Sequence, residues 1–174
     1  MSEMDFIRPL APIGVIVAVL CYTRRKKEVG GWLMFFYYQI FASIALFLLQ
    51  GIWRFREYLP SWWESEWDHI IFLGAVLPRL LAFVLVGAVS TLLLYHRDWF
   101  WVRNLKVALF AAIVLLAFSL LVDLAYFPSS IFTNCLRLIM LAAWLIYFIV
   151  SKRVHHVFRT RDWDKFGNQI TTDS

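Results

Sequence analysis

The stretch "AVLPRLLAFVLVG", residues 75–87, decides how this chain must fold. It lies inside a run, residues 70–95, whose only charged side chain is that of Arg79, directly after Pro78. Apolar runs of about 18 or more residues are typical of transmembrane helices. A charge inside such a helix costs at least about 2.5–3.5 kcal/mol on insertion scales. The stretch therefore predicts a membrane-spanning helix with an arginine that needs a partner.

The rest of the chain extends this prediction. Of its 174 residues 61% are hydrophobic, whereas soluble domains contain about 45–50% apolar residues. Helices satisfy their own backbone hydrogen bonds, and no alternating barrel pattern is present. We expect an all-α, polytopic transmembrane helical bundle with four core helices plus a short N-terminal helix. The apolar segments are residues 6–23, 32–53, 70–95, 105–127 and 131–150.

Three regions follow from this pattern. We predict an N-terminal hydrophobic segment with a basic cytoplasmic loop in residues 1–28, a four-helix membrane domain in residues 29–158, and a polar cytoplasmic tail in residues 159–174. Glu3 and Asp5 make a poor start for a cleavable signal, so we expect the first segment to be retained.

The net charge of +5 arises from cations at the ends of the apolar segments. This pattern indicates topology, and no nucleic-acid-binding motif accompanies it. By the positive-inside rule the richer side is cytoplasmic, which places the C-terminus inside, and the N-terminus outside if residues 6–23 span. The richer side carries residues 24–27, Arg97, Arg103, Lys106, Lys152, Arg153, Arg159, Arg161 and Lys165, and the other side carries Arg8, Arg54 and Arg56 among acidic residues.

The loops predict contact with the membrane surface. In the outer loop, Ser61 and Glu64 fit a capping box. They predict an interfacial helix with Trp63 and Trp67 on one face. The inner loop near residues 96–104 and the tail from residue 151 mix aromatic residues with cations, which suits anionic lipid headgroups.

Arg79 has two interpretations. Pro78 begins the true span and Arg79 lies near the outer headgroups, or a Pro-kinked helix carries Arg79 to real depth. A partner exists for the second case, because Asp123 lies four residues, about 6 Å, from the outer end of its segment. Arg137 lies six residues, about 9 Å, inside the last segment. All three charges therefore fall in the outer half of the membrane.

Helical phase supports this convergence, because each segment has one small or polar face turned toward its neighbours. These faces are Gln39, Ser43 and Gln50; Arg79, Phe83, Gly87 and Ser90; Ala108, Ala112, Ser119 and Asp123; and Asn134, Arg137 and Trp144. We predict a bundle whose outer half encloses a candidate ligand-binding set of Arg79, Asp123, Arg137, Gln50 and Asn134.

Two readings of this set compete. It is a buried ion pair that fixes helix packing, or it is a polar cavity open to the outside. Two guanidiniums face one carboxylate, and an extra buried cation is expected to meet water, a lipid phosphate or an anionic solute. No catalytic or metal-binding set is predicted, and no cofactor. Ser129 and Ser130 have no nearby histidine, and His155 and His156 suit a solvated tail.

Two stretches resemble a known family. "GGWLMFF" and "RLIMLAAWLIYFIVSKRVHHVF" are similar to the bacterial domain-of-unknown-function 2569 family over about residues 29–158. The resemblance implies a small four-helix protein of the bacterial inner membrane, and it implies no activity. The matching residues are Gly30, Gly31, Trp32, Leu33, Arg137, Trp144, Tyr147, Phe148, Ser151, Arg153 and Val154.

The functional expectation is the binding or movement of a small anionic or lipid-like ligand through an outward-facing polar pocket. A structural or accessory subunit of a membrane complex is the alternative, and a lipid-modifying enzyme comes third because a catalytic set is missing. Expected partners are membrane lipids and the anionic ligand, with no nucleic acid. Because five helices are few for a transporter, a homodimer or larger membrane complex stays open.

Overall fold

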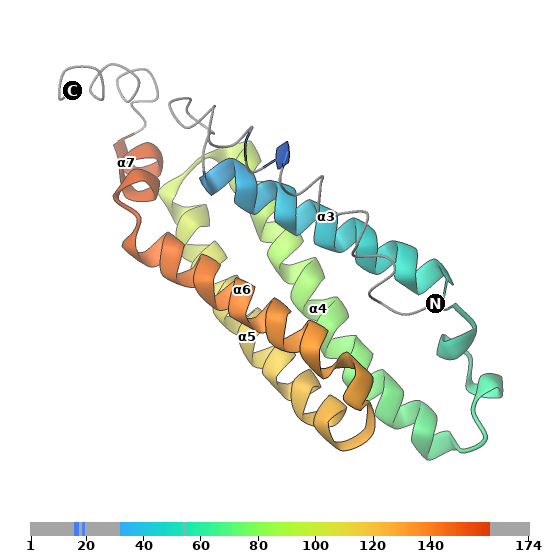
Figure 1. Ribbon diagram of the computed structural model, residues 1–174. Helices are drawn as coiled ribbons and strands as arrows, with labels where there is room; N and C mark the ends of the chain where they lie inside the picture. Colours follow the sequence, from blue (N-terminus) through green and yellow to red (C-terminus); the bar gives the residue numbers. More distant parts are fainter. Residues whose placement is uncertain (1–15, 18, 20–31, 54, 161–174) are drawn as a thin grey trace.

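The computed structural model describes residues 16, 17, 19, 32–53 and 55–160, and every regular element in this part of the chain is helical. The predicted all-α helical bundle is therefore confirmed. Its elements are α3 (Trp32–Trp53), η1 (Phe55–Tyr58), η2 (Pro60–Trp62), α4 (Glu66–His96), α5 (Trp99–Tyr126), η3 (Pro128–Ser130), α6 (Ile131–Val150) and α7 (Lys152–Thr160), as Figure 1 shows.

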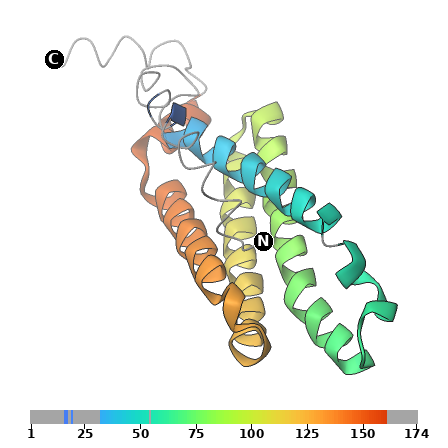
Figure 2. The same cartoon turned by 45° about the vertical axis from the view of Figure 1, so that its right-hand side comes forward.

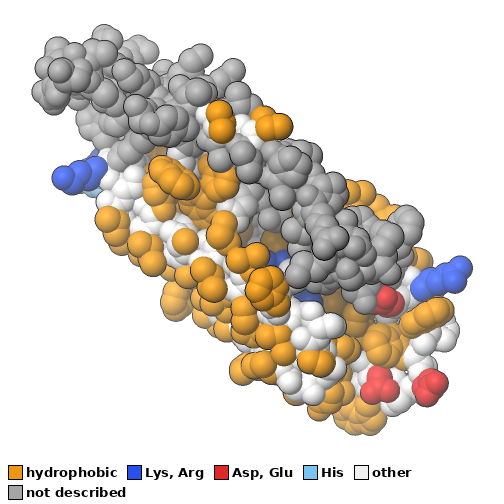
Figure 3. All heavy atoms as spheres, in the orientation of Figure 1, with side chains coloured by type: hydrophobic (Ala, Val, Ile, Leu, Met, Phe, Trp, Pro, Cys, Tyr) orange, Lys and Arg blue, Asp and Glu red, His pale blue; other side chains and the backbone are white. Residues whose placement is uncertain are grey.

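Four of these helices are long and apolar enough to cross a membrane, and they contain Trp32–Leu49, Glu66–His96, Trp99–Tyr126 and Pro128–Val150. Their outward side chains are apolar, with Phe110 and Ile139 each 62% exposed. Hydrophobic side chains cover much of the visible surface in Figure 3. The chain is a multi-pass membrane protein. Of the predicted N-terminal helix, residues 6–23, the structure describes only residues 16, 17 and 19, which are helical, and both chain ends lie outside the described residues.

Charged residues divide the bundle into two ends. The acidic end, where α3 and α5 finish and α4 and α6 begin, carries Glu57, Glu64, Glu66 and Asp68. The basic end, at the opposite ends of these helices, carries Arg97, Arg103, Lys106, Lys152 and Arg159. The alternation of charge along the sequence thus becomes a separation in space.

The loop at the acidic end differs from the prediction. No helix begins at Ser61, because residues 55–62 form the two 3-10 turns η1 and η2, with Pro60 opening the second. Ser65 is the N-cap instead, and its Oγ accepts a hydrogen bond from the Trp67 backbone N–H at 3.2 Å. The proposed shared face of Trp63 and Trp67 is therefore wrong, since only Trp67 is helical.

The loop at the basic end is shorter than predicted, because α5 begins at Trp99 rather than at Leu105. Arg97 ends α4 in the left-handed conformation (φ 54°), and its N–H donates to the Leu93 carbonyl at 2.9 Å. Asp98 is extended and its carbonyl accepts from the Trp101 N–H at 3.1 Å. A two-residue connection therefore joins α4 and α5 and sets them side by side.

Helices α4 and α5 form the most extensive interface, and α6 packs on α5. Helix α3 crosses α4 at Gly87, where the Ile44 Cδ1 atom lies 2.6 Å from the position that a Cβ would occupy. Beyond this crossing α3 separates from the other three helices toward Trp53, as both ribbon views show (Figures 1 and 2). Gly87 therefore permits a close approach that a bulky side chain would block.

Candidate functional site

Helix α4 runs without a break through Pro78. Proline lacks a backbone N–H and disturbs the carbonyls of the preceding turn, so these need help from neighbours in a membrane. The carbonyl without its usual donor is that of Gly74, and the Ser119 hydroxyl of α5 donates to the next carbonyl in this turn, that of Ala75, at 2.8 Å. Ser119 is fully buried. The turn that precedes Pro78 is thus part of the contact between α4 and α5.

Arg79 points into the bundle. Its Nε donates to the Ser119 Oγ at 2.6 Å, and its Nη2 forms an ion pair with the Asp123 Oδ1. The Asp123 side chain has no exposed surface, and that of Arg79 is 12% exposed. Because Ser119 and Asp123 are four residues apart, one face of α5 receives both ends of the guanidinium. The partner predicted for Arg79 is confirmed.

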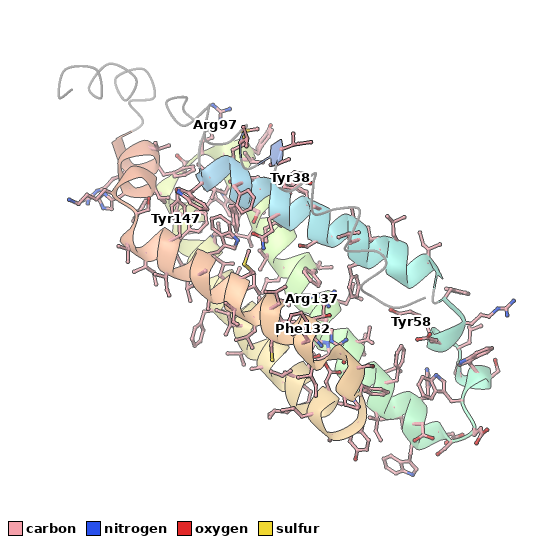
Figure 4. The ribbon with its side chains drawn as sticks, in the orientation of Figure 1. Tyr38, Tyr58, Arg97, Phe132, Arg137 and Tyr147 are labelled. Carbon is pink, nitrogen blue, oxygen red and sulfur yellow. The ribbon has the colours of Figure 1, made fainter. Side chains whose placement is uncertain are left out.

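Helix α6 completes the arrangement. The Asn134 Nδ2 donates to the second carboxylate oxygen of Asp123, and the Asn134 Oδ1 accepts from the Arg137 Nη1 at 3.2 Å. Asn134 is 1% exposed. The Arg137 Cζ lies 5.8 Å from the centroid of the Phe83 ring, and Figure 4 shows Arg137 between α6 and α4. Three helices therefore meet in one hydrogen-bonded chain.

We call this chain the polar network, and its members are Arg79, Ser119, Asp123, Asn134 and Arg137. Four of the five predicted site residues belong to it. The fifth, Gln50, lies in α3, but its side chain is outside the described part of the structure. Ser119 was not predicted as a site residue, although its place on the polar face of α5, one turn from Asp123, was the signal that could have identified it.

Exposure divides the polar network into two layers. Ser119, Asp123 and Asn134 are sealed inside the bundle, whereas the guanidiniums of Arg79 and Arg137 are only partly buried. Both oxygens of Asp123 already accept hydrogen bonds. The carboxylate and the amide therefore orient the arginines, and the arginines are the members that a ligand could reach.

A second polar contact lies closer to the basic end. The Trp144 Nε1 donates to the Gln39 Oε1 at 2.8 Å and joins α6 to α3. Phe36 packs against Trp144 and Phe148, with ring centroids 5.1 and 4.9 Å apart. The predicted inward faces of α3 and α6 thus meet, mainly through aromatic rings.

His155 is exposed, as predicted for a solvated segment, but this segment is the helix α7, whose other side packs against α5. Val154, Val157 and Phe158 are buried. The His155 ring packs against that of Trp99, at 4.9 Å between centroids. The side chain of His156 is outside the described residues, and Ser130 donates to the Phe127 carbonyl at 2.9 Å within a turn.

The fold and the polar network define a helical, multi-pass membrane protein with an ionic cluster enclosed among three of its helices. Comparisons with protein-family models, with curated proteins and with solved structures find no match to the chain. The likeness to the domain-of-unknown-function 2569 family stays a prediction.

Proposed function

We propose that the protein binds or moves a small anionic or lipid-like ligand at the polar network, from the side of the acidic end. One observation carries the proposal. Two guanidiniums from α4 and α6 are held by a shared, sealed Asp123–Asn134 pair while they retain some exposure. The planar fork of a guanidinium suits phosphate or carboxylate oxygens. Arg137 contacts the anion, and Arg79 supports it from the opposite helix.

The proposed location is a bacterial inner membrane, with the basic end in the cytoplasm and the acidic end outside. The positive-inside rule supports this orientation, since Lys and Arg gather where α4 ends and α7 begins. The family resemblance supports the bacterial setting. The ligand then approaches from the outer side, either from solution or from the outer leaflet.

The test is calorimetric titration of the full chain in dodecyl maltoside with inorganic phosphate, succinate and dihexanoyl phosphatidylglycerol. At least one probe should bind. Arg137→Gln should weaken that binding by about 10- to 100-fold, since hydrogen bonds to charged groups contribute about 1.5–3 kcal/mol. The thermal unfolding temperature should stay near that of the unaltered chain.

Arg56→Gln is the matched control, because it removes the same charge from an exposed side chain at the acidic end. It should leave the titration unchanged. Equal weakening in both variants would show that the probe responds to net charge rather than to the polar network. Failure of all three probes to bind would reject the proposal.

The second candidate function is a structural or accessory subunit of a membrane complex. The observation that favours it is the sealing of Asp123, whose two oxygens are both occupied within the chain. In that case Arg137→Gln lowers the stability of a complex or homodimer, and no anion in the panel binds. Co-purification of partner chains with the unaltered protein, lost in Arg137→Gln, separates this function from ligand binding.

A further inference from the structure

Helix α7 forms a fixed platform at the basic end. Its apolar face, Val154, Val157 and Phe158, is at least 96% buried against the bundle. Its opposite face presents Lys152, His155 and Arg159, which are all exposed. Residues three, four and seven apart share one side of a helix, so these groups form a single polar strip. The cations of α7 are therefore held in place relative to α5.

Four side chains form a row across the junction between α5 and α7, namely Lys106, Trp99, His155 and Arg159. We call this row the α5–α7 corner. The Lys106 Nζ lies 5.0 Å from the centroid of the Trp99 ring, within the range of a cation–π contact. The Trp99 ring meets the His155 ring edge to face at 4.9 Å. His155 Nε2 and Arg159 Nη1 are 3.1 Å apart. Two aromatic rings thus separate two cations.

The contact between His155 and Arg159 has one donor and one acceptor. An arginine guanidinium has only donors, so the Nε2 atom of His155 must accept its hydrogen bond. The row therefore has one cation at each end, Lys106 on α5 and Arg159 on α7.

The surroundings of the corner combine positive charge with apolar surface. Asp98 is the one acidic residue that the described chain places at the basic end, against Arg97, Arg103, Lys106, Lys152 and Arg159. On α5, beside the corner, Phe100 is 57% exposed and Val107 is 65% exposed. A ligand that fits both properties has an anionic head and an apolar tail. A soluble anion would contact only the positive charge and leave the apolar surface unused.

We infer that the α5–α7 corner binds the phosphate headgroup of an anionic phospholipid from the leaflet at the basic end. Arg159 contacts the phosphate oxygens, and Lys106 attracts the headgroup from the far side of the Trp99 and His155 rings. The acyl chains lie along the apolar surface of α5. This site is separate from the polar network, which lies toward the opposite end of α5, and it is independent of the function proposed there.

The test is native mass spectrometry of the full chain in dodecyl maltoside at about 0.15 M salt, with dioleoyl phosphatidylglycerol or dioleoyl phosphatidylcholine added. The unaltered chain should retain the anionic lipid in preference to the zwitterionic one. A variant with Lys106→Gln and Arg159→Gln should lose about 25-fold in affinity for phosphatidylglycerol, about fivefold for each cation near a headgroup.

The control carries Arg103→Gln and Lys152→Gln, which remove two exposed charges from the same end. Its affinity should fall by no more than about twofold, because neither Arg103 nor Lys152 belongs to the row that receives the phosphate. Equal loss in both double variants would mean diffuse attraction and would overturn the proposal. So would unchanged retention in the corner variant.

Two further measurements cover a folding defect and a different ligand source. Arg159→Gln alone leaves the contact between Lys106 and Trp99 in place, and it should lose about fivefold in affinity with unchanged helical circular dichroism. Full retention in this variant would count against the proposal. Inorganic phosphate added in excess should not displace the lipid. Displacement would show that the corner binds free phosphate instead, and it would overturn the proposal.

Discussion

The two halves of the bundle are held together in different ways. Toward the acidic end, α4, α5 and α6 meet through the polar network, whose centre is the sealed Asp123 carboxylate. Toward the basic end, α3 and α6 meet through rings, with Phe36 in edge contact with Trp144 and Phe148. One helix, α6, takes part in both within 20 residues.

This difference shows that charge is not required to assemble these helices. Hydrogen bonds between transmembrane helices contribute only about 0.6 kcal/mol on average, and close packing achieves association without them. The half toward the basic end even leaves Tyr37 Oη and Ser90 Oγ buried without hydrogen-bond partners among the described residues. The half toward the acidic end satisfies its buried polar groups in a connected chain. A group of charged side chains at one depth in the membrane is typical of a functional site.

The largest expected effect comes from Asp123→Ala. It removes the carboxylate that neutralises Arg79 and accepts from Asn134, so a buried guanidinium loses its counter-charge. Breaking a buried ion pair in this way costs about 3–5 kcal/mol. Reversible unfolding in mixed micelles measures the loss of stability.

The double variant with Arg79→Leu and Asp123→Ala sharpens this comparison. Removing both charges should recover most of the lost stability, because neither member of the ion pair is left without the other. If the double variant is as unstable as Asp123→Ala, the network stabilises the bundle through shape rather than charge, and the contrast between the two halves fails.

A slightly smaller loss, about 3 kcal/mol, is expected for Phe148→Ala, which opens a cavity beside Phe36. Phe148 lies fourteen residues beyond Asn134 on α6 (148 − 134 = 14), about 21 Å of helix rise. The losses from Phe148→Ala and Asp123→Ala should therefore add to within about 0.5 kcal/mol. Phe148→Leu is the control, with an expected cost below about 1.5 kcal/mol. A strong departure from additivity would show that the halves are one cooperative unit.

The sequence predicted the sites of helix contact better than the ends of the helices. Periodicity placed Asp123, Ser119 and Ala112 on one face of α5, and all three are fully buried. A stripe of small and polar residues has one explanation in an apolar helix, which is contact with a neighbour. The ion pair between Arg79 and Asp123 followed from the same reasoning, because an intramembrane charge needs a partner.

The helix ends could not be predicted because several local signals competed there. Ser61 and Ser65 both suit an N-cap, and the choice of Ser65 depends on Pro60 and on the loop contacts, such as the hydrogen bond from Trp63 Nε1 to the Glu57 carbonyl at 2.8 Å. Likewise, the packing of α7 was hidden in a short segment rich in charge. Its buried residues, Val154, Val157 and Phe158, become interpretable only beside α5.

The smallest expected effect lies at the boundary between the halves, where α3 crosses α4 at Gly87. A methyl group there would meet only the flexible tip of Ile44, so Ile44 can move aside. Alanine is also more favourable than glycine inside a helix, by about 0.5–1 kcal/mol, so Gly87→Ala should change the free energy of unfolding by less than about 1 kcal/mol.

Gly87→Leu should cost about 1–3 kcal/mol, because a branched side chain forces α3 away from α4. Cross-linking of cysteines placed at Phe47 and Phe83, whose rings lie 5.4 Å apart, reports that separation. Unchanged cross-linking in Gly87→Leu would mean that the crossing of α3 is set by other contacts than this glycine.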